Sequence, residues 1–439
     1  MLLARDGHDV VLLERDATPL PADPDEAFHW DRRGAPQVRH SHAFLARGRN
    51  VLRDHLPEVR DALLAAGVRE VGWSDMIPDT IADKSPRPGD EDLVMLACRR
   101  TTFEWTLRKV ALEAHGIDLR DGVGVTGLVM DGSRVVGVRT DAGEERADLV
   151  VDATGRPSRL VEMLDVPEQK SDTGIVYLSR FYRLRGDAPN EFPFMGADLG
   201  YIKFAVFRGD NDTFSITIAQ ATDDTELRDL RDPARFDAAV MVVELMKIWA
   251  DPAVSEPISD LHYMGGLFNR VRWFVRAGNP VVTGLVAVGD ASVCTNPLYG
   301  RGCSLGLVHG TLLADAIRSG EPIELALDEA TKRELVPWYE ASVAQDRVNA
   351  QVARGEKLSD ADEYMRSVVQ DGLFHLVRTD ADVSRVWTRG FNLLSAPYDM
   401  LTDQSVMPRV LEAWEHREER EPEPLPGPDR ETFLRQVHS

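Results

Sequence analysis

The stretch "GLVAVGDASVCTNPLYGRGCSLG", residues 284–306, combines a short apolar strand, two turns and the start of a helix. The apolar run after Gly284 has the composition of a buried strand, and it ends at Gly289 and Asp290. The glycine-rich residues 300–302 then open a helical pattern. An aspartate at a strand end can accept hydrogen bonds from sugar-alcohol hydroxyls, and a helix N-terminus stabilises negative charge. The stretch therefore predicts a ligand site where a strand meets a helix.

The first residues, "MLLARDGHDVVLLERD" (1–16), have the pattern of a helix end followed by a buried parallel strand that finishes on Glu14. In a dinucleotide-binding unit, an acidic residue at this place bonds the adenosine ribose, about 20 residues after a glycine-rich turn. The chain has no room for that turn before Glu14. We therefore expect the first strand and its glycine turn to lie upstream of Met1, and the start of the chain to be misassigned.

A G-x-G-x-x-G pattern does occur later, at Gly122, Gly124 and Gly127. Phosphate binding by this motif requires a strand before it and a helix N-terminus after it. Here the pattern is followed by "LVMDGSRVVGV" (128–138), which predicts a strand, a turn and a second strand. We therefore interpret these residues as hairpin glycines.

Composition limits the possible functions. A chain of 439 residues exceeds what one hydrophobic core usually serves, so we expect two or more domains. The formal charge of −22 argues against nucleic acid or an anionic membrane as the main partner. The three cysteines lack C-x-x-C spacing, which supports neither disulfides nor a zinc site. No apolar run approaches a transmembrane span or a signal peptide, so we expect a cytoplasmic protein.

The remaining patterns divide the chain into regions. Residues 19–31 are rich in proline and acidic residues and predict a loop, and residues 97–116 predict an amphipathic helix. Long alternating strands in residues 174–220 predict an antiparallel sheet, followed by helices in residues 233–250. From Glu321 onward the pattern is mostly helical.

Four segments together resemble a known family. Glu14 at a strand end, Arg100 in "CRRTTFEWTLR", "DATGRPSR" (152–159) and residues 284–306 are similar to the FAD-dependent oxidoreductases typified by p-hydroxybenzoate hydroxylase. Within that superfamily, "RRGAPQVRHSHAFLARG" (32–48) resembles the branch that includes bacterial polyether epoxidases. The resemblance covers most of the chain up to the helix after Gly302, and residues 284–306 are its most specific part.

The resemblance implies an α/β fold. We expect an FAD-binding, doubly wound parallel sheet that lacks its first strand, an inserted antiparallel-sheet substrate domain and a helical C-terminal region. The implied FAD-binding parts are residues 1–72, 98–170 and 273–320. The substrate domain comprises residues 73–97 and 171–272, and the helical region residues 321–439.

The resemblance also assigns cofactor-binding residues by position. Glu14 would bind the adenosine ribose, and Val125 would contact the adenine through its backbone. Arg100 would lie near the pyrophosphate or the ribityl chain, and Asp290 would bond the ribityl hydroxyls. Pro297 would lie beside the flavin ring.

Gly300 and Gly302 would offer backbone amides to the pyrimidine end of the flavin, where a helix N-terminus stabilises the anionic reduced ring. Arg39, His40 and His42 in "VRHSH" leave two interpretations open, contact with flavin or substrate and structural hydrogen bonding. We expect no metal here, since no third ligand follows at a suitable spacing.

The implied function is that of an FAD-dependent monooxygenase, which uses NAD(P)H and O2 to hydroxylate or epoxidise an apolar small molecule. The cofactor supplies the difficult chemistry, so no catalytic base is assigned. A halogenase is disfavoured because "VGWSDMIP" (71–78) keeps only part of the tryptophan motif "GWxWxIP". Two alternatives stay open: a flavin-dependent reductase of isoprenoid-like double bonds, and a flavin-free remnant that binds a ligand or a partner.

Overall fold

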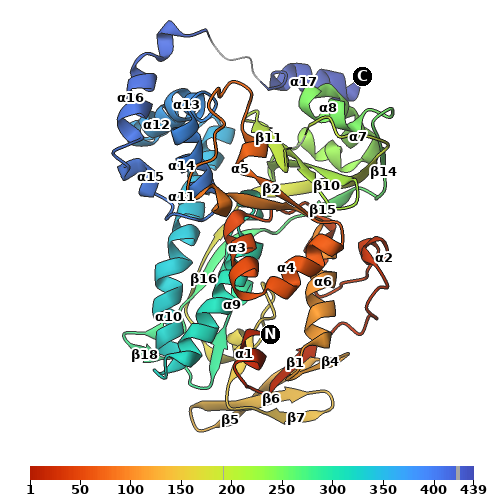
Figure 1. Ribbon diagram of the computed structural model, residues 1–439, viewed down its shortest axis with the longest axis vertical. Coiled ribbons are helices and arrows are strands. Elements are labelled where there is room, and N and C mark those ends of the chain that lie inside the picture. Colours follow the sequence, from red (N-terminus) through yellow and green to blue (C-terminus); the bar gives the residue numbers. More distant parts are fainter. Residues whose placement is uncertain (191, 422–425) are drawn as a thin grey trace.

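The computed structural model describes residues 1–190, 192–421 and 426–439. The structure contains two pairs of parallel strands, β1 (Val10–Glu14) with β4 (Ile117–Asp121), and β8 (Val150–Asp152) with β19 (Leu285–Ala287). Helices and antiparallel sheets surround these pairs (Figure 1). The predicted α/β fold class is confirmed.

Strand β1 differs from the buried strand that the sequence predicts. Val11 and Leu12 are 45% and 41% exposed, although Leu13 packs on the cluster that contains Val150 and Leu285. Among the described residues, β1 pairs with β4 alone. Successive side chains of a strand point to opposite faces, so both faces of β1 are open at its centre. The described neighbours of β1 therefore bury only part of its apolar side chains.

The segment after β4 forms a three-stranded antiparallel sheet of β5 (Val125–Asp131), β6 (Arg134–Thr140) and β7 (Gly143–Arg146). Gly122 lies before β5 with a φ of +70°, in the left-handed region that glycine adopts without strain. Gly127 lies inside β5. The interpretation of these residues as hairpin glycines is confirmed, because a strand rather than a helix follows them.

A larger antiparallel sheet lies at the opposite end of the molecule from β5–β7 (Figure 1). Its strands follow the order β11-β12-β13-β10-β14, with β15 paired to β10, and the predicted antiparallel sheet is thereby confirmed. The bounds are β10 Ile175–Leu184, β11 Phe194–Asp198, β12 Ile202–Arg208, β13 Thr213–Ala221, β14 Ser255–Pro257 and β15 His262–Met264.

The two faces of this sheet have different side chains. On one face, large residues such as Phe214 and Ile216 belong to the main hydrophobic core. Helices α7 (Pro233–Val242), α8 (Glu244–Ala250) and α17 (Arg430–His438) contribute to that core. Figure 1 shows α17 beside α7 and α8, although these helices lie far apart in the sequence. The opposite face carries hydroxyl groups.

The helices of the N-terminal part lie between the two ends of the molecule (Figure 1). Their bounds are α1 Leu2–Arg5, α2 Pro24–Phe28, α3 Ala46–His55, α4 Pro57–Ala65, α5 Trp73–Met76 and α6 Arg100–Glu113. The prediction of a loop at residues 19–31 is wrong for Pro24–Phe28, which form helix α2. This helix forms for a local reason. The Asp23 carboxylate accepts from the amides of Asp25 and Glu26, and Pro24 occupies the first turn.

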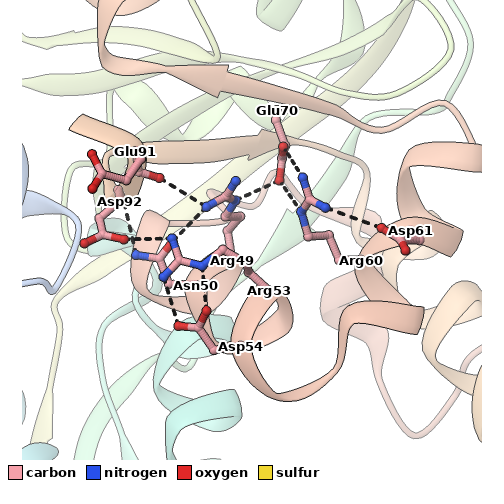
Figure 2. A network of polar contacts seen from close by, with 9 residues as sticks. All are labelled: Arg49, Asn50, Arg53, Asp54, Arg60, Asp61, Glu70, Glu91 and Asp92. Atoms are coloured by element: carbon pink, nitrogen blue, oxygen red, sulfur yellow. Dashed lines mark hydrogen bonds and ion pairs between the residues drawn. The ribbon is translucent and has the colours of Figure 1, made fainter. Parts of the chain in front are cut away.

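Strands β2 (Arg69–Gly72) and β3 (Val94–Ala97) form an antiparallel pair beside α3 and α4. Glu70 joins these elements, because its carboxylate accepts from Arg60 of α4 and Arg49 of α3 at 2.7 Å (Figure 2). Although burial acts in the opposite direction, these arginines lower the pKa of Glu70 to about 2. The network fixes α3 against the strand pair.

The last third of the described chain is mainly helical, as predicted. Helix α9 (Gly302–Arg318) packs against α3 and α10, and a core around Val383 and Val406 joins the later helices. The bounds of those helices are α10 Ile323–Glu334, α11 Val336–Ala353, α12 Asp360–Ser367, α13 Phe374–Val377, α14 Ala381–Phe391, α15 Asp399–Thr402 and α16 Met407–Glu415, with a π-helical turn at Val368–Leu373. Two further strands, β9 (Glu168–Asp172) and β20 (Val293–Cys294), flank β16 (Phe268–Arg272).

Candidate functional site

The N-terminus of α9 is the centre of the candidate site. Gly300 precedes it with a φ of +65°, and a Cβ atom there would lie 2.8 Å from the Cβ of Ala43. Both the conformation and the close approach require glycine. Helix α9 begins at Gly302 without a side-chain cap, and a Cβ at Gly302 would meet no atom within 4 Å. The first amides of a 17-residue helix are therefore available to a ligand.

Asp290 lies in the turn between β19 and β20, and this turn packs against α9. Burial raises the pKa of its carboxyl group, although Arg156, Arg100 and Arg270 place positive charge nearby. The Cys294 thiol is its hydrogen-bonding neighbour. A half-buried carboxylate with so few protein donors retains acceptor capacity for the hydroxyl groups of a ligand.

Arg100, the first residue of α6, reaches the N-terminus of α9. Its Nη1 donates to the Cys303 Sγ at 2.7 Å, and its Nε lies 3.7 Å from the Glu104 carboxylate. Burial opposes the charge, but Cys303 and Glu104 hold the pKa of Arg100 above its ordinary value. Among the described residues, the buried Nε has no hydrogen-bond acceptor. Arg100 is therefore a cationic donor with unused capacity.

Two residues without a sequence signal, His309 and Asp346, hold the segment between Gly289 and Gly300 in place. His309 of α9 is fully buried, and its Nδ1 accepts from the amide of Gly289 at 3.1 Å. Its Nε2 lies 3.0 Å from the Thr331 hydroxyl. Burial lowers the pKa of His309 to about 4, so the ring is neutral at pH 7 and can accept. A single histidine in an apolar helix carries no sequence signal for this role.

The second such residue is Asp346 of α11. Its carboxylate accepts from Asn269, Asn296 and Tyr299 at 2.6, 2.8 and 2.6 Å. Asn296 in turn caps the turn at Pro297, because its Oδ1 accepts from the Leu298 amide at 3.0 Å. Asp346 thus ties the loop before Gly300 to a helix that the sequence places about 50 residues later.

Glu14 and Val125 lie together at another part of the molecule. The Val123 amide donates to the Glu14 carbonyl at 3.0 Å, which brings the start of β5 beside the end of β1. The Glu14 carboxylate accepts from Arg32 Nη2 and from the Asp16 amide, both at 3.0 Å. The predicted ribose ligand therefore already has two protein donors.

Glu104 connects this region with the α9 end. One of its carboxylate oxygens lies 3.0 Å from Arg32, and the other lies 3.7 Å from Arg100. The structure brings together Arg100, Asp290, Gly300 and Gly302 through long-range contacts and chain proximity. Exposed Pro297 adjoins them in the chain.

Arg39 lies at the end of a short 3-10 turn, next to His40 in the chain. It is exposed, and its charge lowers the pKa of His262, an effect second to that of burial. His40 and His42 are instead buried or half-buried, and the His42 Nδ1 donates to the His40 carbonyl at 2.9 Å. Within the ranges that the structure describes, no group of three or more His, Cys, Asp or Glu side chains is arranged to hold a metal ion.

A small cavity with room for about one water molecule adjoins these histidines. Its lining is mixed, with Arg100 and two hydroxyl groups beside aromatic rings. The lining includes His40, Ser41, Ser215, Phe181 and Phe207.

The residues around α9 fit the flavin half of FAD. The uncapped helix end, the open backbone at Gly302 and the unpartnered Nε of Arg100 provide donors, and Asp290 provides an acceptor. The adenosine half has fewer partners, since Glu14 is already engaged by Arg32. In the described part of the chain, no helix is long and apolar enough to span a membrane.

The class of fold follows from comparison with solved structures. The chain has the fold of the FAD-dependent monooxygenases and halogenases. It is similar to PqsL, a probable FAD-dependent monooxygenase from Pseudomonas aeruginosa, with a TM-score of 0.56 and 16% identity over 80% of this chain and 92% of that one. It is also similar to the flavin-dependent brominase Bmp2, with a TM-score of 0.58 and 17% identity over 94% of this chain and 100% of that one.

In sequence, the chain is similar to Protein Rv3254 of Mycobacterium tuberculosis. The two are 26% identical over 462 residues, which cover 94% of this chain and 91% of that protein. No protein-family model matches the chain. The resemblance to the p-hydroxybenzoate hydroxylase superfamily is confirmed at the level of the fold.

Proposed function

We propose that this chain is an FAD-dependent monooxygenase that hydroxylates or epoxidises an apolar small molecule, with NAD(P)H as electron donor and O2 as oxidant. The convergence of Arg100 and Asp290 on the uncapped N-terminus of α9 carries the proposal. This arrangement combines a cation, a hydroxyl acceptor and oriented amides at the end of a parallel strand, in a fold shared with FAD-dependent enzymes.

In this proposal, residues 1–72, 98–170 and 273–320 bind FAD, and residues 73–97 and 171–272 bind the substrate. FAD, when bound, supplies the redox chemistry. Asp290 accepts from the ribityl hydroxyls, and Arg100 donates to a phosphate or carbonyl oxygen. The amides at Gly300 and Gly302 stabilise negative charge on the ring. Glu14 and Val125 contact the adenosine.

The fold alone does not separate a monooxygenase from a brominase. The Trp73 of "VGWSDMIP" is buried with Ile77 and Ile81, and the Arg385 guanidinium lies 3.6 Å from its ring centre. This tryptophan therefore contributes to a hydrophobic core. Its position supports the monooxygenase over the halogenase.

Two observations favour a second candidate, a flavin-free protein that binds an apolar ligand or a partner. The centre of β1 exposes Val11 and Leu12, and Glu14 is engaged by Arg32. Both features weaken the adenosine half of the site. A flavin-dependent reductase remains the alternative activity if FAD binds, since it uses the same cofactor contacts.

The test is the visible absorption spectrum of the full chain after incubation with FAD and desalting. We expect a retained flavin band that bleaches with NADH or NADPH and returns in air. Arg100→Met should lose the band, whereas Arg139→Met, in the exposed hairpin β6, should keep it. A colourless wild-type protein would overturn the proposal and support the flavin-free candidate.

A further inference from the structure

Glu104 is a carboxylate that two arginines of the candidate site share. It lies on α6 one turn after Arg100, so the two side chains leave the same face of the helix. One carboxylate oxygen lies 3.0 Å from Arg32 Nη1, and the other lies 3.7 Å from Arg100 Nε. Arg32 holds Glu14 in the adenosine half of the site, and Arg100 lies in the flavin half. Glu104 therefore links the two halves.

The contact between Glu104 and Arg100 is incomplete. Its separation of 3.7 Å exceeds hydrogen-bond distance. Among the described residues, neither the Arg100 Nε nor the Glu104 oxygen that faces it has a hydrogen-bond partner, although both atoms are buried. A buried polar atom without a partner costs free energy, so each of these atoms gains when a partner reaches it. Arg100 can therefore turn this donor either to Glu104 or to a ligand.

Arg32 cannot turn away from its carboxylates toward solvent. Its side chain is 8% exposed, with Glu14 3.0 Å and Asp16 3.5 Å away. Charges in such a place are weakly screened. When another donor takes one carboxylate, the remaining ones must compensate more of the Arg32 charge. The Asp16 oxygen near Arg32 already accepts from the Gly34 amide at 2.8 Å. The response therefore falls mainly on Glu104.

We propose that Glu104 couples the two halves of the cofactor site, so that binding of the adenosine ribose strengthens binding of the flavin half. A ribose hydroxyl that donates to Glu14 competes with Arg32 for that carboxylate. Arg32 is then drawn to Glu104, and Glu104 attracts Arg100 less. Arg100 becomes free to donate to a phosphate or carbonyl oxygen of the flavin half. The inference rests on the proposed function, and Glu104 acts in it as a positioning residue.

The test measures how the full chain binds the two halves of FAD as separate molecules. FMN is the flavin half, and its fluorescence reports its dissociation constant. Adenosine is the other half without its phosphate, so it does not repel FMN. We expect saturating adenosine to lower the dissociation constant of FMN about fivefold or more. By linkage, FMN must lower the dissociation constant of adenosine by the same factor, which calorimetry measures.

The matched control ligand is 2′,3′-dideoxyadenosine, which keeps the adenine ring but lacks the ribose hydroxyls that would donate to Glu14. We expect it to leave the dissociation constant of FMN unchanged. This control uses the wild-type chain, so it does not depend on the folding of a variant. Equal enhancement by adenosine and by the dideoxy analogue would show that the ribose contact is not the source of the coupling and would overturn the inference.

Glu104→Gln keeps the size of the side chain and removes its charge. Because this variant no longer attracts Arg100, it should bind FMN alone more tightly than wild type, and adenosine should add nothing further. Damage to the fold would weaken FMN binding instead, so the direction of the change separates positioning from a structural role. Glu113→Gln is the matched control, since Glu113 is exposed at the end of the same helix and should leave the coupling at its wild-type value.

The outcomes distinguish the coupling from the proposed function. Retained FAD without mutual enhancement of FMN and adenosine would overturn the coupling alone. Mutual enhancement without retained FAD would reject the proposed function and keep the coupling. Failure of either half to bind would overturn the inference. Weaker FMN binding by Glu104→Gln, with adenosine still enhancing it, would overturn the inference and leave Glu104 a purely structural counterion.

Discussion

Arg99 and Arg100 are neighbours at the start of α6, yet they serve two different regions. The Arg99 side chain is 1% exposed and holds Asp210, which follows β12, through its Nε and Nη2 at 3.1 and 2.6 Å. Arg100 points to Cys303 at the start of α9. Arg99 is the extended residue before the helix and Arg100 is the first helical residue, so the two side chains leave the backbone in different directions and face different parts of the fold.

The carboxylates beside these arginines differ in the same way. Asp210 also accepts from the Arg99 amide at 2.7 Å and from the Thr102 hydroxyl at 2.8 Å. Asp290 is half-buried, burial raises its pKa, and Cys294 is its hydrogen-bonding neighbour. We call a carboxylate saturated when protein donors occupy its oxygens, as in Asp210, and undersaturated when they do not, as in Asp290. A saturated carboxylate holds two elements together, whereas an undersaturated one can accept hydrogen bonds from a ligand. The contrast separates a structural region from a functional one.

The largest expected effect is the loss of stability when the saturated carboxylate, Asp210, is changed. Asp210→Asn leaves the buried Arg99 charge without its counterion, so the free energy of unfolding should fall by about 3–5 kcal/mol in urea denaturation. Asp212→Asn is the matched control, since Asp212 is exposed and asparagine tolerates its φ of +57°. A loss below about 1 kcal/mol for Asp210→Asn would show that the ion pair contributes little and would remove the contrast.

Substitution of the undersaturated carboxylate, Asp290, should weaken FAD binding rather than lower stability. The pKa of Asp290 is raised in the fold, so its charged form destabilises the folded chain at neutral pH, and Asp290→Asn should not lower the free energy of unfolding. FAD affinity should fall about tenfold or more, or ~1.4 kcal/mol, measured by flavin fluorescence. Asp165→Asn, an exposed position, should keep wild-type affinity. Unfolding of Asp290→Asn with unchanged FAD affinity would place Asp290 with the structural carboxylates.

The smallest effect is expected at the partly exposed network of Figure 2. The Glu70 side chain is 21% exposed, so Glu70→Gln should cost about 1 kcal/mol at pH 7 after solvent screening. Its folded pKa of about 2 lies below the ordinary 4.5, so the wild type should lose this contribution as the pH falls from about 4.5 to 2. Urea denaturation at several pH values measures the difference. A Glu70→Gln variant with the same pH dependence as wild type would contradict the assignment.

Local structure followed from local sequence. The strand at 285–287, the turn at Gly289 and the helix from Gly302 form as predicted, because apolar runs and glycine act within a few residues. Alternation in residues 174–220 predicted the antiparallel strands for the same reason. The helix at Pro24–Phe28 was missed although its cap, Asp23, was visible in the sequence.

Partners across the fold were not predictable in this way. Arg100 meets a residue 203 positions away, and the hydrogen bond between His40 and Ser179 spans 139 positions. The sequence predicted that Arg100 and Asp290 serve one site only through family resemblance, and it gave no signal for His309 or Asp346. Periodicity specifies which face of an element is apolar, but not which distant side chain that face will contact.

By itself, therefore, the sequence determined the elements, the α/β class and the glycine-rich turn, since backbone propensity and burial pattern are local properties. The tertiary structure decided which of two adjacent arginines forms a structural ion pair and which lies at the candidate site, and it joined two strands and one loop into a chain of hydroxyl groups. Those outcomes depend on packing, because burial makes a hydrogen-bond partner decisive only after distant elements have met.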